Sequence, residues 1–486
     1  MSLTTTAGYS WETQYNRVVR TRSRGLLAGV ETTNSGTVLQ VSDSVYADFR
    51  DMAFFASEQV LALNERLALT GGIRADRSSA NGDRHKYYVF PRASASYRFP
   101  DLGELVNEVK LRGGWGRTGN RPRYGDRDVL LAVGTTIGGT ATPVQAGTLG
   151  DSLIKPETLT EIEAGADVTF LKRRLQFEGT WYSRRITDLL LQPATIPSGG
   201  ITNRNINGGE LSNKGVEAGL TAAAVQTRDV DLTLRATFAK NKQEIKNLPA
   251  GVPRFPAPGS FGASFGRNFI SPGGETTWIW GNVPLDANRN PLPIGVLVTD
   301  PSAVAFIRDT VAGNYNPDFV MQFSGSLRWK RLTLATTVSW QQGGQVSDMT
   351  RDLWDEGGTS RDYDDPVTRE TMGDGWALNV PSGYTAGSFR YDSWSNGDVR
   401  AYVEDATNVR VRDISLSYQA PDSWLQSLGA RSLRFTAQAR NPFVFTHYWS
   451  FDPEFNNFGA TNLNRFIDLA PFPGNRQFYL SVDVGW

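Results

Sequence analysis

Hydrophobic and polar residues alternate with a period of two along most of the chain. From Val230 to Phe238, for example, every second residue is apolar and the residues between are polar. Successive side chains of a β-strand point to opposite faces, so this spacing gives a strand one apolar face and one polar face. Patterns with the 3.6-residue period of a long helix are missing. The sequence therefore predicts an all-β protein.

About fourteen segments follow this rule. They lie near residues 3–12, 45–61, 66–78, 89–99, 106–118, 156–171, 173–191, 210–226, 229–243, 317–329, 331–343, 408–420, 431–445 and 476–486. Several are longer than the usual soluble strand of about 5–6 residues. Many reach the roughly 9–11 residues that cross a bilayer at a tilt.

The connections between these segments alternate in length. The short ones lie at residues 62–65, 172, 227–228 and 330, and the long ones at residues 119–155, 192–209, 244–316, 344–407 and 446–475. Counted back from the C-terminus, all the long connections fall on the side opposite that end. Short turns at one end and long loops at the other are typical of an antiparallel transmembrane β-barrel of the outer membrane. A soluble sandwich or propeller would explain the alternation, but not the one-sided loops.

Aromatic residues near the strand ends fit the interfacial girdles of such a barrel. These residues are Trp115, Trp181, Tyr182, Trp329, Trp340 and Tyr418. Ordinary aromatic packing in any β protein is the alternative for each of them.

Composition excludes several classes of function. The 486 residues contain 50 Lys and Arg against 50 Asp and Glu, so no basic excess exists for binding nucleic acid. There is no cysteine, which excludes disulfides and thiol catalysis. The two histidines, His85 and His447, are too far apart in sequence for an H-E-x-x-H zinc site, and no G-x-S-x-G motif occurs. We expect no catalytic residues, no cofactor and no enzyme activity.

At seven places in order, the residues match motifs of one known family. The matching stretches are 73–79 with 90–94, 110–112 with Gly116, Gly119 and Asn120, 156–158 with Gly165, Asp167, Tyr182 and 188–190, 209–217, 408–418, 441–443 with 452–454, and Arg476 with the last strand. From about residue 45 to residue 486, the chain resembles the C-terminal β-barrel portion of SusC/RagA-type TonB-dependent outer-membrane transporters.

The resemblance implies a 22-stranded barrel, of which the fourteen segments here are a part. Full-length members of the family carry a signal peptide, a TonB-binding segment and a globular plug ahead of this region. Residues 1–9 have neither the basic nor the apolar region of a signal peptide. We therefore expect residues 1–486 to be the C-terminal part of a receptor barrel, without the plug and signal peptide. A smaller barrel that closes with fourteen strands is the alternative.

The function implied by the resemblance is energised uptake of oligosaccharides, peptides or other large nutrients across the bacterial outer membrane. The implied partners are outer-membrane lipids, a SusD-like lipoprotein at the external loops, TonB acting through the plug, and the barrel-assembly machinery. A passive porin and a soluble carbohydrate-binding β protein are the alternative functions.

Aromatic side chains of the predicted external loops are the candidate substrate contacts, because such rings stack on sugars or clamp apolar ligands. They are Trp278, Trp280, Trp354, Trp376, Tyr391 and Trp394. Loops of this length must also build small cores of their own, and aromatic side chains usually fill them, so a loop core is the preferred interpretation of these residues. Residues 254–281 and 363–394 are the candidate surfaces for the lipoprotein.

Two further candidates come from short segments. The last strand has alternating apolar residues and an aromatic end, which resembles the signal for barrel assembly; its residues are Phe478, Leu480, Val482, Val484 and Trp486. Asp286, Asn288 and Asn290 have the spacing of a calcium loop, but Pro291 stands where the glycine belongs. A turn held by Asn and Asp side chains is the preferred interpretation of that segment, so no metal site is expected.

Overall fold

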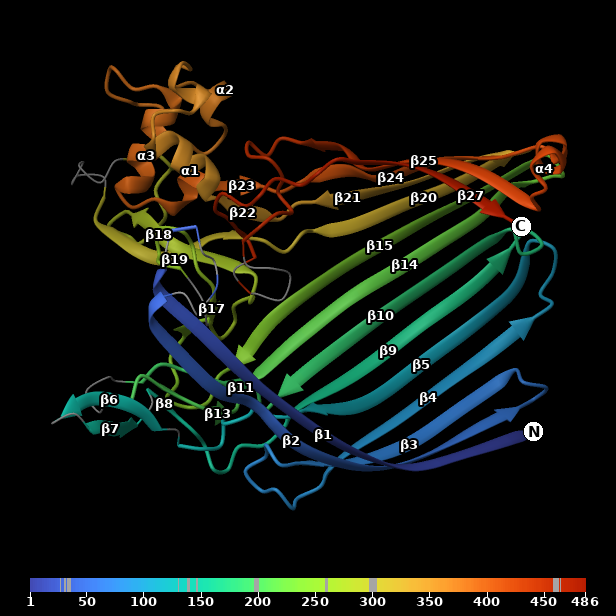
Figure 1. The fold of residues 1–486 in the computed structure, drawn as a ribbon, viewed down its shortest axis with the longest axis horizontal. Helices are drawn as coiled ribbons and strands as arrows, with labels where there is room; N and C mark the ends of the chain where they lie inside the picture. The colour runs from blue at the N-terminus through green and yellow to red at the C-terminus, as the bar shows by residue number, and fades with distance from the viewer. Residues whose placement is uncertain are drawn as a thin grey trace.

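A single large antiparallel sheet forms the wall of the molecule (Figure 1). The computed structural model describes residues 1–486 except 27, 30, 31, 33–35, 130, 138, 139, 146, 196–200, 258–260, 297–303, 458–462 and 464, with the backbone alone at 42–46, 131–137 and 140–145. Within the described part of the chain, the sheet has 14 strands, and β1 and β27 are its edges. In spatial order the strands are β1 (Ser2–Leu26), β2 (Gly36–Ala62), β3 (Leu67–Ser78), β4 (Tyr88–Pro100), β5 (Val106–Asn120), β9 (Glu157–Phe170), β10 (Leu175–Thr187), β14 (Glu210–Gln226), β15 (Val230–Asn247), β20 (Phe319–Trp329), β21 (Leu332–Gln342), β24 (Asn408–Gln419), β25 (Ser432–Thr446) and β27 (Gln477–Gly485).

Each of these strands coincides with one of the predicted segments, so the predicted fold class is confirmed. The clearest difference is at the N-terminus, where β1 and β2 extend well beyond the predicted 3–12 and 45–61. β2 pairs with β1 along most of its length but with β3 only over Asp51–Ala62. The remaining length of β1 and β2 is therefore a two-stranded ribbon beyond the wall.

Smaller elements lie in the connections. They are β6 (Leu131–Ile137), β7 (Thr140–Gln145), β8 (Thr148–Leu149), β11 (Leu190–Leu191), β12 (Asn203–Arg204), β13 (Ile206–Asn207), β16 (Phe255–Pro256), β17 (Phe269–Ile270), β18 (Trp278–Leu285), β19 (Phe306–Asn314), β22 (Gln345–Asp348), α1 (Met349–Glu356), η3 (Arg361–Tyr363), α2 (Arg369–Met372), α3 (Ala386–Ser395), η4 (Val399–Tyr402), β23 (Val403–Asp405), α4 (Asp422–Leu428) and β26 (Ile467–Asp468).

Turns and loops divide between the two ends of the wall as predicted. The tight turns place residues such as Asn64, Lys172 and Lys330 in the left-handed conformation, and they lie at the same end as both chain termini (Figure 1). The long loops with α1, α2 and α3 lie at the opposite end. Outer-membrane barrels have the same arrangement, with short turns on the periplasmic side and long loops on the external side.

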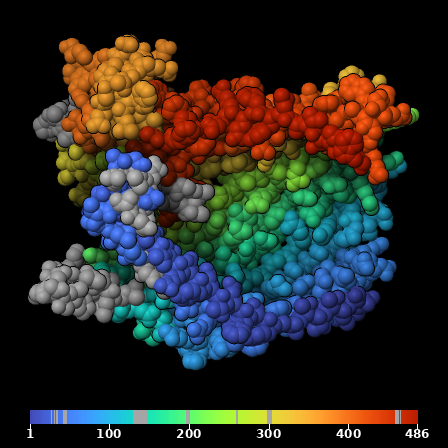
Figure 2. Space-filling view, in the orientation of Figure 1, coloured from blue at the N-terminus to red at the C-terminus, as the bar shows by residue number. Residues whose placement is uncertain are grey.

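Register aligns apolar residues in rows across the wall. One row crosses six strands and consists of Leu480, Ala437, Leu416, Leu334, Leu327 and Leu232. The adjacent row consists of Ser481, Thr436, Ser417, Thr333, Arg328 and Asp231. The two rows point to opposite faces, because side chains alternate along each strand. Figure 2 shows that the wall is hollowed on one side. By the pattern of outer-membrane barrels, the apolar face is the outer, lipid-facing one and the polar face lines this interior.

Four of the predicted girdle aromatics, Trp115, Trp181, Trp329 and Tyr418, are well exposed on the apolar face. Tyr182 is different, because it follows Trp181 directly and so points to the inner face, where it is buried. No helix among the described residues is long and apolar enough to cross a membrane.

The assignment of the two faces predicts that a charge destabilises the protein to very different extents at two neighbouring positions of β20. Phe323 is exposed on the apolar face and pairs with Ala236 and Val338, so Phe323→Arg should destabilise the inserted protein by about 2–4 kcal/mol. The control Gln322→Arg puts the same charge on the inner face and should cost much less. Urea unfolding in lipid vesicles measures both. Equal losses for the two variants would contradict the assignment of the faces.

Candidate functional site

The external loops fold into one body, which we call the loop body and define as the described residues of 248–318, 343–407 and 447–476. Its apolar core is the largest in the molecule among the described residues. The buried members of that core are Ile279, Met349, Met372, Trp376, Ala386, Phe389, Ala401, Tyr402, Phe466 and Ile467. They come from all three loops. The strands of the wall bury little by comparison, because one of their faces meets lipid.

A small sheet fixes the three loops relative to one another. β22 pairs with β23 in antiparallel fashion and with β26 in parallel fashion, so it joins the second loop to the third. The Ser347 hydroxyl of β22 also donates a 2.7 Å hydrogen bond to the carbonyl of Phe265 in the first loop. The loop body therefore has defined internal geometry.

A network of charged residues lies beside this core. Arg390 is 3% exposed at its side chain and contacts Asp355 at 2.8 Å and Asp362 at 2.6 Å. Arg351 contacts Asp362 at 2.5 Å, and the Tyr402 hydroxyl donates to Asp355 at 2.9 Å. Buried ions need such pairing to offset the cost of leaving water.

The pKa values of the two carboxyls follow from this environment. Burial would raise the pKa of Asp362, but hydrogen bonds from Arg351 and the charges of Arg351 and Arg390 outweigh it and lower the pKa. At Asp355, burial is the larger effect, and it raises the pKa despite the charge of Arg390 and the hydrogen bond from Tyr402.

A second group of buried carboxyls lies where β22 meets β26. Asp348 and Asp468 are partners in the parallel pair, with 0% and 1% of their surface exposed. Ser450 donates to Asp348 at 2.7 Å, and the Tyr448 hydroxyl donates to Asp468 at 2.7 Å. Burial raises the pKa of both carboxyls, and nearby carboxylates raise that of Asp348 further.

Two of the motifs recognised in the sequence meet at the mouth of the wall. Arg410 of β24, which is 2% exposed, forms an ion pair with Asp452 and lies 3.5 Å from Glu454. Arg412 contacts Glu454 at 2.6 Å and donates to the Ser339 hydroxyl of β21 at 2.8 Å. These contacts tie the last loop to the inner face of two strands.

The six candidate aromatics occupy different environments in the loop body. Trp280 and Trp376 are each 8% exposed, and Trp376 belongs to the loop core. Trp394 donates a 2.6 Å hydrogen bond to Ser264 and packs at 5.8 Å from the Tyr391 ring. These four are consistent with the preferred interpretation, a loop core.

The other two are more accessible. Trp278 is half-buried beside Trp280, with 6.1 Å between the ring centroids. Trp354 of α1 has 44% of its surface exposed, which makes it the most exposed of the six side chains. No ligand contact tests their predicted role, which stays a prediction.

The segment with calcium-loop spacing forms a turn after β18. The Asp286 carboxyl accepts the backbone N–H of Asn290 at 2.8 Å and its side-chain amide at 3.2 Å. The hydrogen bond from the Asn290 backbone lowers the pKa of Asp286. These oxygens therefore already have partners within the turn.

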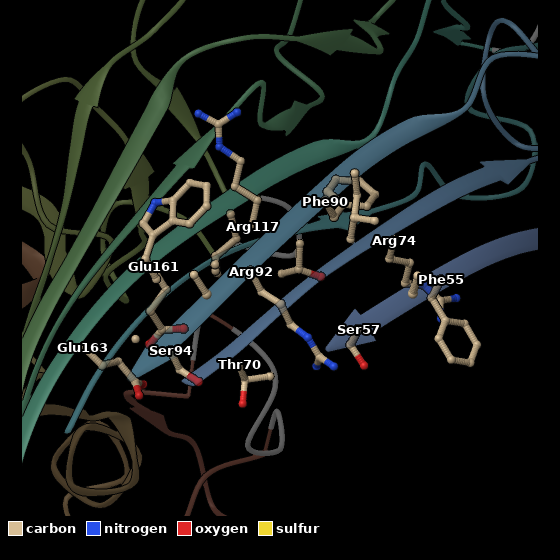
Figure 3. Close-up of a pocket in the computed structure, with 18 of the residues that line it drawn as sticks. Phe55, Ser57, Thr70, Arg74, Phe90, Arg92, Ser94, Arg117, Glu161 and Glu163 are labelled. Atoms are coloured by element: carbon tan, nitrogen blue, oxygen red, sulfur yellow. The ribbon is translucent and has the colours of Figure 1, made fainter. Parts of the chain in front are cut away.

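The inner face of the wall has a hollow that the sequence did not single out. It has a volume of about 780 Å³ and is lined mainly by residues of β2, β3, β4, β5 and β9. Ser57, Thr70, Arg92, Ser94, Glu161 and Glu163 project to one side of the wall there, whereas Arg117 points away (Figure 3). The sequence does show polar residues at alternate positions of these strands, which indicates a polar inner face. To locate the hollow on that face, one must also know which strands pair and in which register.

Charges in this hollow are partly paired. Glu161 forms a 2.6 Å ion pair with Arg184 of β10. Arg92 has no hydrogen-bond or ion-pair partner within the described residues, so its guanidinium faces the interior as a free cation. The hollow therefore offers both hydrogen-bonding groups and charge to whatever lies in the lumen.

The apolar side chains of the last strand, β27, are exposed and therefore accessible to a binding partner. Its lipid-facing side chains have between 43% and 89% of their surface exposed, and they are Phe478, Leu480, Val482 and Val484, with Trp486 following at 74%. Recognition by the assembly machinery stays a prediction.

The loop body should respond to pH through Asp352 of α1. Burial, followed by the nearby Glu356 and Asp355, raises its pKa from 3.8 to about 7. The protonated carboxyl therefore stabilises the loop body; this contribution is complete below pH 3.8 and is lost as pH rises through about 7. We expect hydrogen-exchange protection of the α1 amides to fall between about pH 4 and pH 7 and to level off above that, and to fall less in Asp352→Asn. The exposed Asp364→Asn is the control. An unchanged pH response in Asp352→Asn would contradict this assignment.

Comparison with known proteins identifies the family. Residues 2–334 match the family model described as TonB dependent receptor-like, beta-barrel. TonB-dependent receptor P3 of Formosa agariphila is 24% identical over 95% of this chain and 47% of its own length. TonB-dependent receptor SusC of Bacteroides thetaiotaomicron is 23% identical over 91% of this chain and 44% of its own length. The chain thus spans about half the length of the curated relatives it matches.

The fold agrees with a solved structure. The RagAB peptide transporter superposes with a TM-score of 0.75 over 99% of this chain and 53% of the other, at 17% sequence identity. This likeness supports the predicted fold. The matched family model and the curated relatives confirm the predicted resemblance and the outer-membrane location. The chain belongs to the TonB-dependent receptor β-barrel family of outer-membrane proteins.

Proposed function

We propose that this chain forms part of the wall and the external loops of a TonB-dependent importer of large nutrients. The match of residues 2–334 to the TonB-dependent receptor barrel is the observation on which the proposal rests. The position of the long loops at one end of the wall and the polar inner face are consistent with capture outside and passage through the interior.

The proposed substrates are oligosaccharides, peptides or other large nutrients. A relative, SusC, and a structural neighbour, the RagAB peptide transporter, lend support to this range. A loop body with its own core and charge network suits such substrates, because it presents a fixed surface at the mouth.

The proposed partners follow from the same family. A SusD-like lipoprotein would contact residues 254–281 and 363–394 of the loop body. TonB would act on a plug in the part of a longer protein outside these residues. The barrel-assembly machinery would bind the last strand through Phe478, Leu480, Val482, Val484 and Trp486. In this scheme residues 1–486 supply the wall, the loops and the assembly signal, and the moving part lies elsewhere.

Energy dependence tests the proposal. Cells that express the full-length protein should accumulate a labelled oligosaccharide or peptide, and removal of TonB or collapse of the proton gradient should abolish the accumulation. The matched control is a strain without the gene. Uptake that continues unchanged without TonB would contradict the proposal and favour a passive porin.

Trp354 tests the proposed role of the loop aromatics. Trp354→Ala should weaken substrate binding by about threefold to tenfold, because a stacked ring contributes about 0.5–1.5 kcal/mol. Leu353 lies beside it on α1 with 43% of its surface exposed, so Leu353→Ala is the matched control. Equilibrium binding to the purified receptor measures both. An equal effect of the two variants would exclude a specific stacking role for Trp354.

A further inference from the structure

One periplasmic turn contains a helix. The turn between β24 and β25 holds α4 (Asp422–Leu428), which lies at the end of the wall opposite the loop body (Figure 1). Pro421 is its N-cap residue, and Gly429 ends it with a φ of 62°, a left-handed conformation that favours glycine. The other turns at this end are shorter, so α4 is an addition that closure of the hairpin does not require.

The helix has one apolar face. Trp424 and Leu428 are four residues apart and therefore lie on the same side of α4. They are 49% and 53% exposed, which is unusual for large apolar side chains on a helix that has a wall to pack against. Gln426 is also exposed and lies on the opposite side.

This apolar face continues the lipid-facing surface of the wall. The Trp424 ring lies 6.4 Å from the Tyr418 ring of β24 and 6.4 Å from the Phe435 ring of β25, each with an edge-on geometry. Tyr418 pairs with Leu332 across the sheet, and Phe435 pairs with Val482, so both belong to the apolar rows. Trp424 therefore extends the apolar surface that faces lipid.

Cations lie at the same level. Lys330 and Arg331 are exposed on the adjoining turn between β20 and β21, and Arg431 is exposed at the end of the turn that holds α4. Arg331 lies 3.8 Å from Asp422 at the start of α4, an exposed contact that leaves its guanidinium open to solvent. A tryptophan at the apolar boundary with cations beside it fits the level of phospholipid headgroups.

We propose that α4 lies in the plane of the membrane interface and binds the periplasm-facing phospholipid leaflet. Trp424 and Leu428 enter the boundary between headgroups and acyl chains, Gln426 faces water, and Lys330 and Arg331 face the phosphates. This contact fixes the height of the wall in the bilayer at its C-terminal edge. It depends on the lipid-facing surface and is independent of the transported substrate.

The absence of cysteine from the chain allows a direct test. Leu428→Cys and Gln426→Cys each accept a single spin label in outer-membrane preparations, and the parent protein sets the background. At position 428 we expect frequent collisions with oxygen and few with a polar nickel complex. At position 426, on the same helix, we expect the reverse. Equal exposure of both labels to the nickel complex would overturn the proposal.

A second measurement remains informative if a cysteine variant fails to fold. Trp424→Phe keeps an aromatic ring, and it should reduce the fraction of tryptophan fluorescence quenched by brominated phospholipids. Trp354→Phe removes a similarly exposed tryptophan from the loop body and should not reduce that fraction. If Trp424→Phe leaves the quenched fraction unchanged, the ring lies in water and the proposal is wrong.

Discussion

Every backbone N–H and C=O within a bilayer must find its partner inside the protein, since hydrocarbon offers none. Long antiparallel strand pairs satisfy this requirement. The two faces of each strand then meet different environments, lipid on one side and the interior of the barrel on the other. The row from Leu480 to Leu232 meets lipid, and the row from Ser481 to Asp231 meets the interior. Alternation, strand length and one-sided loops are consequences of the same requirement.

A wall of this kind cannot bury a large apolar core, so the core lies elsewhere. It lies in the loop body, where Ile279, Phe389 and Phe466 from three different loops are almost completely buried. The ion pairs of Arg390 with Asp355 and Asp362 lie beside that core. Arg410 and Arg412 then connect the loop body to the inner face of the strands. The external surface is thus a small folded unit held on a rigid wall.

The sequence predicts the wall well because period-two alternation is local. All the wall strands lie where alternation placed them, and the largest error is the length of β1 and β2, whose outer parts extend beyond the wall. The loop body has no comparable signal. The pattern of Trp376 and Trp394 favoured a loop core but did not exclude ligand contact. Trp376 packs on Phe389 within its own loop, whereas the hydrogen bond from Trp394 to Ser264 joins two loops far apart in the sequence.

Motif recognition had the same limit. The stretches 408–418 and 452–454 were each recognised in the sequence. The contact between Arg410 and Asp452, however, joins residues 42 positions apart in the sequence, and no spacing rule predicts it. The hollow at Arg92 and Glu163 also needs the register of several strands, which a single sequence does not supply.

The most direct test of the central claim is the intact mass of the native protein in outer membranes, detected with an antibody against residues 344–407. If this chain is the barrel part of a plug-bearing receptor, the mass should be about twice the 53.5 kDa of these 486 residues, in line with the lengths of its relatives. A mass near 53.5 kDa would contradict that claim, because TonB would then have no plug to act on.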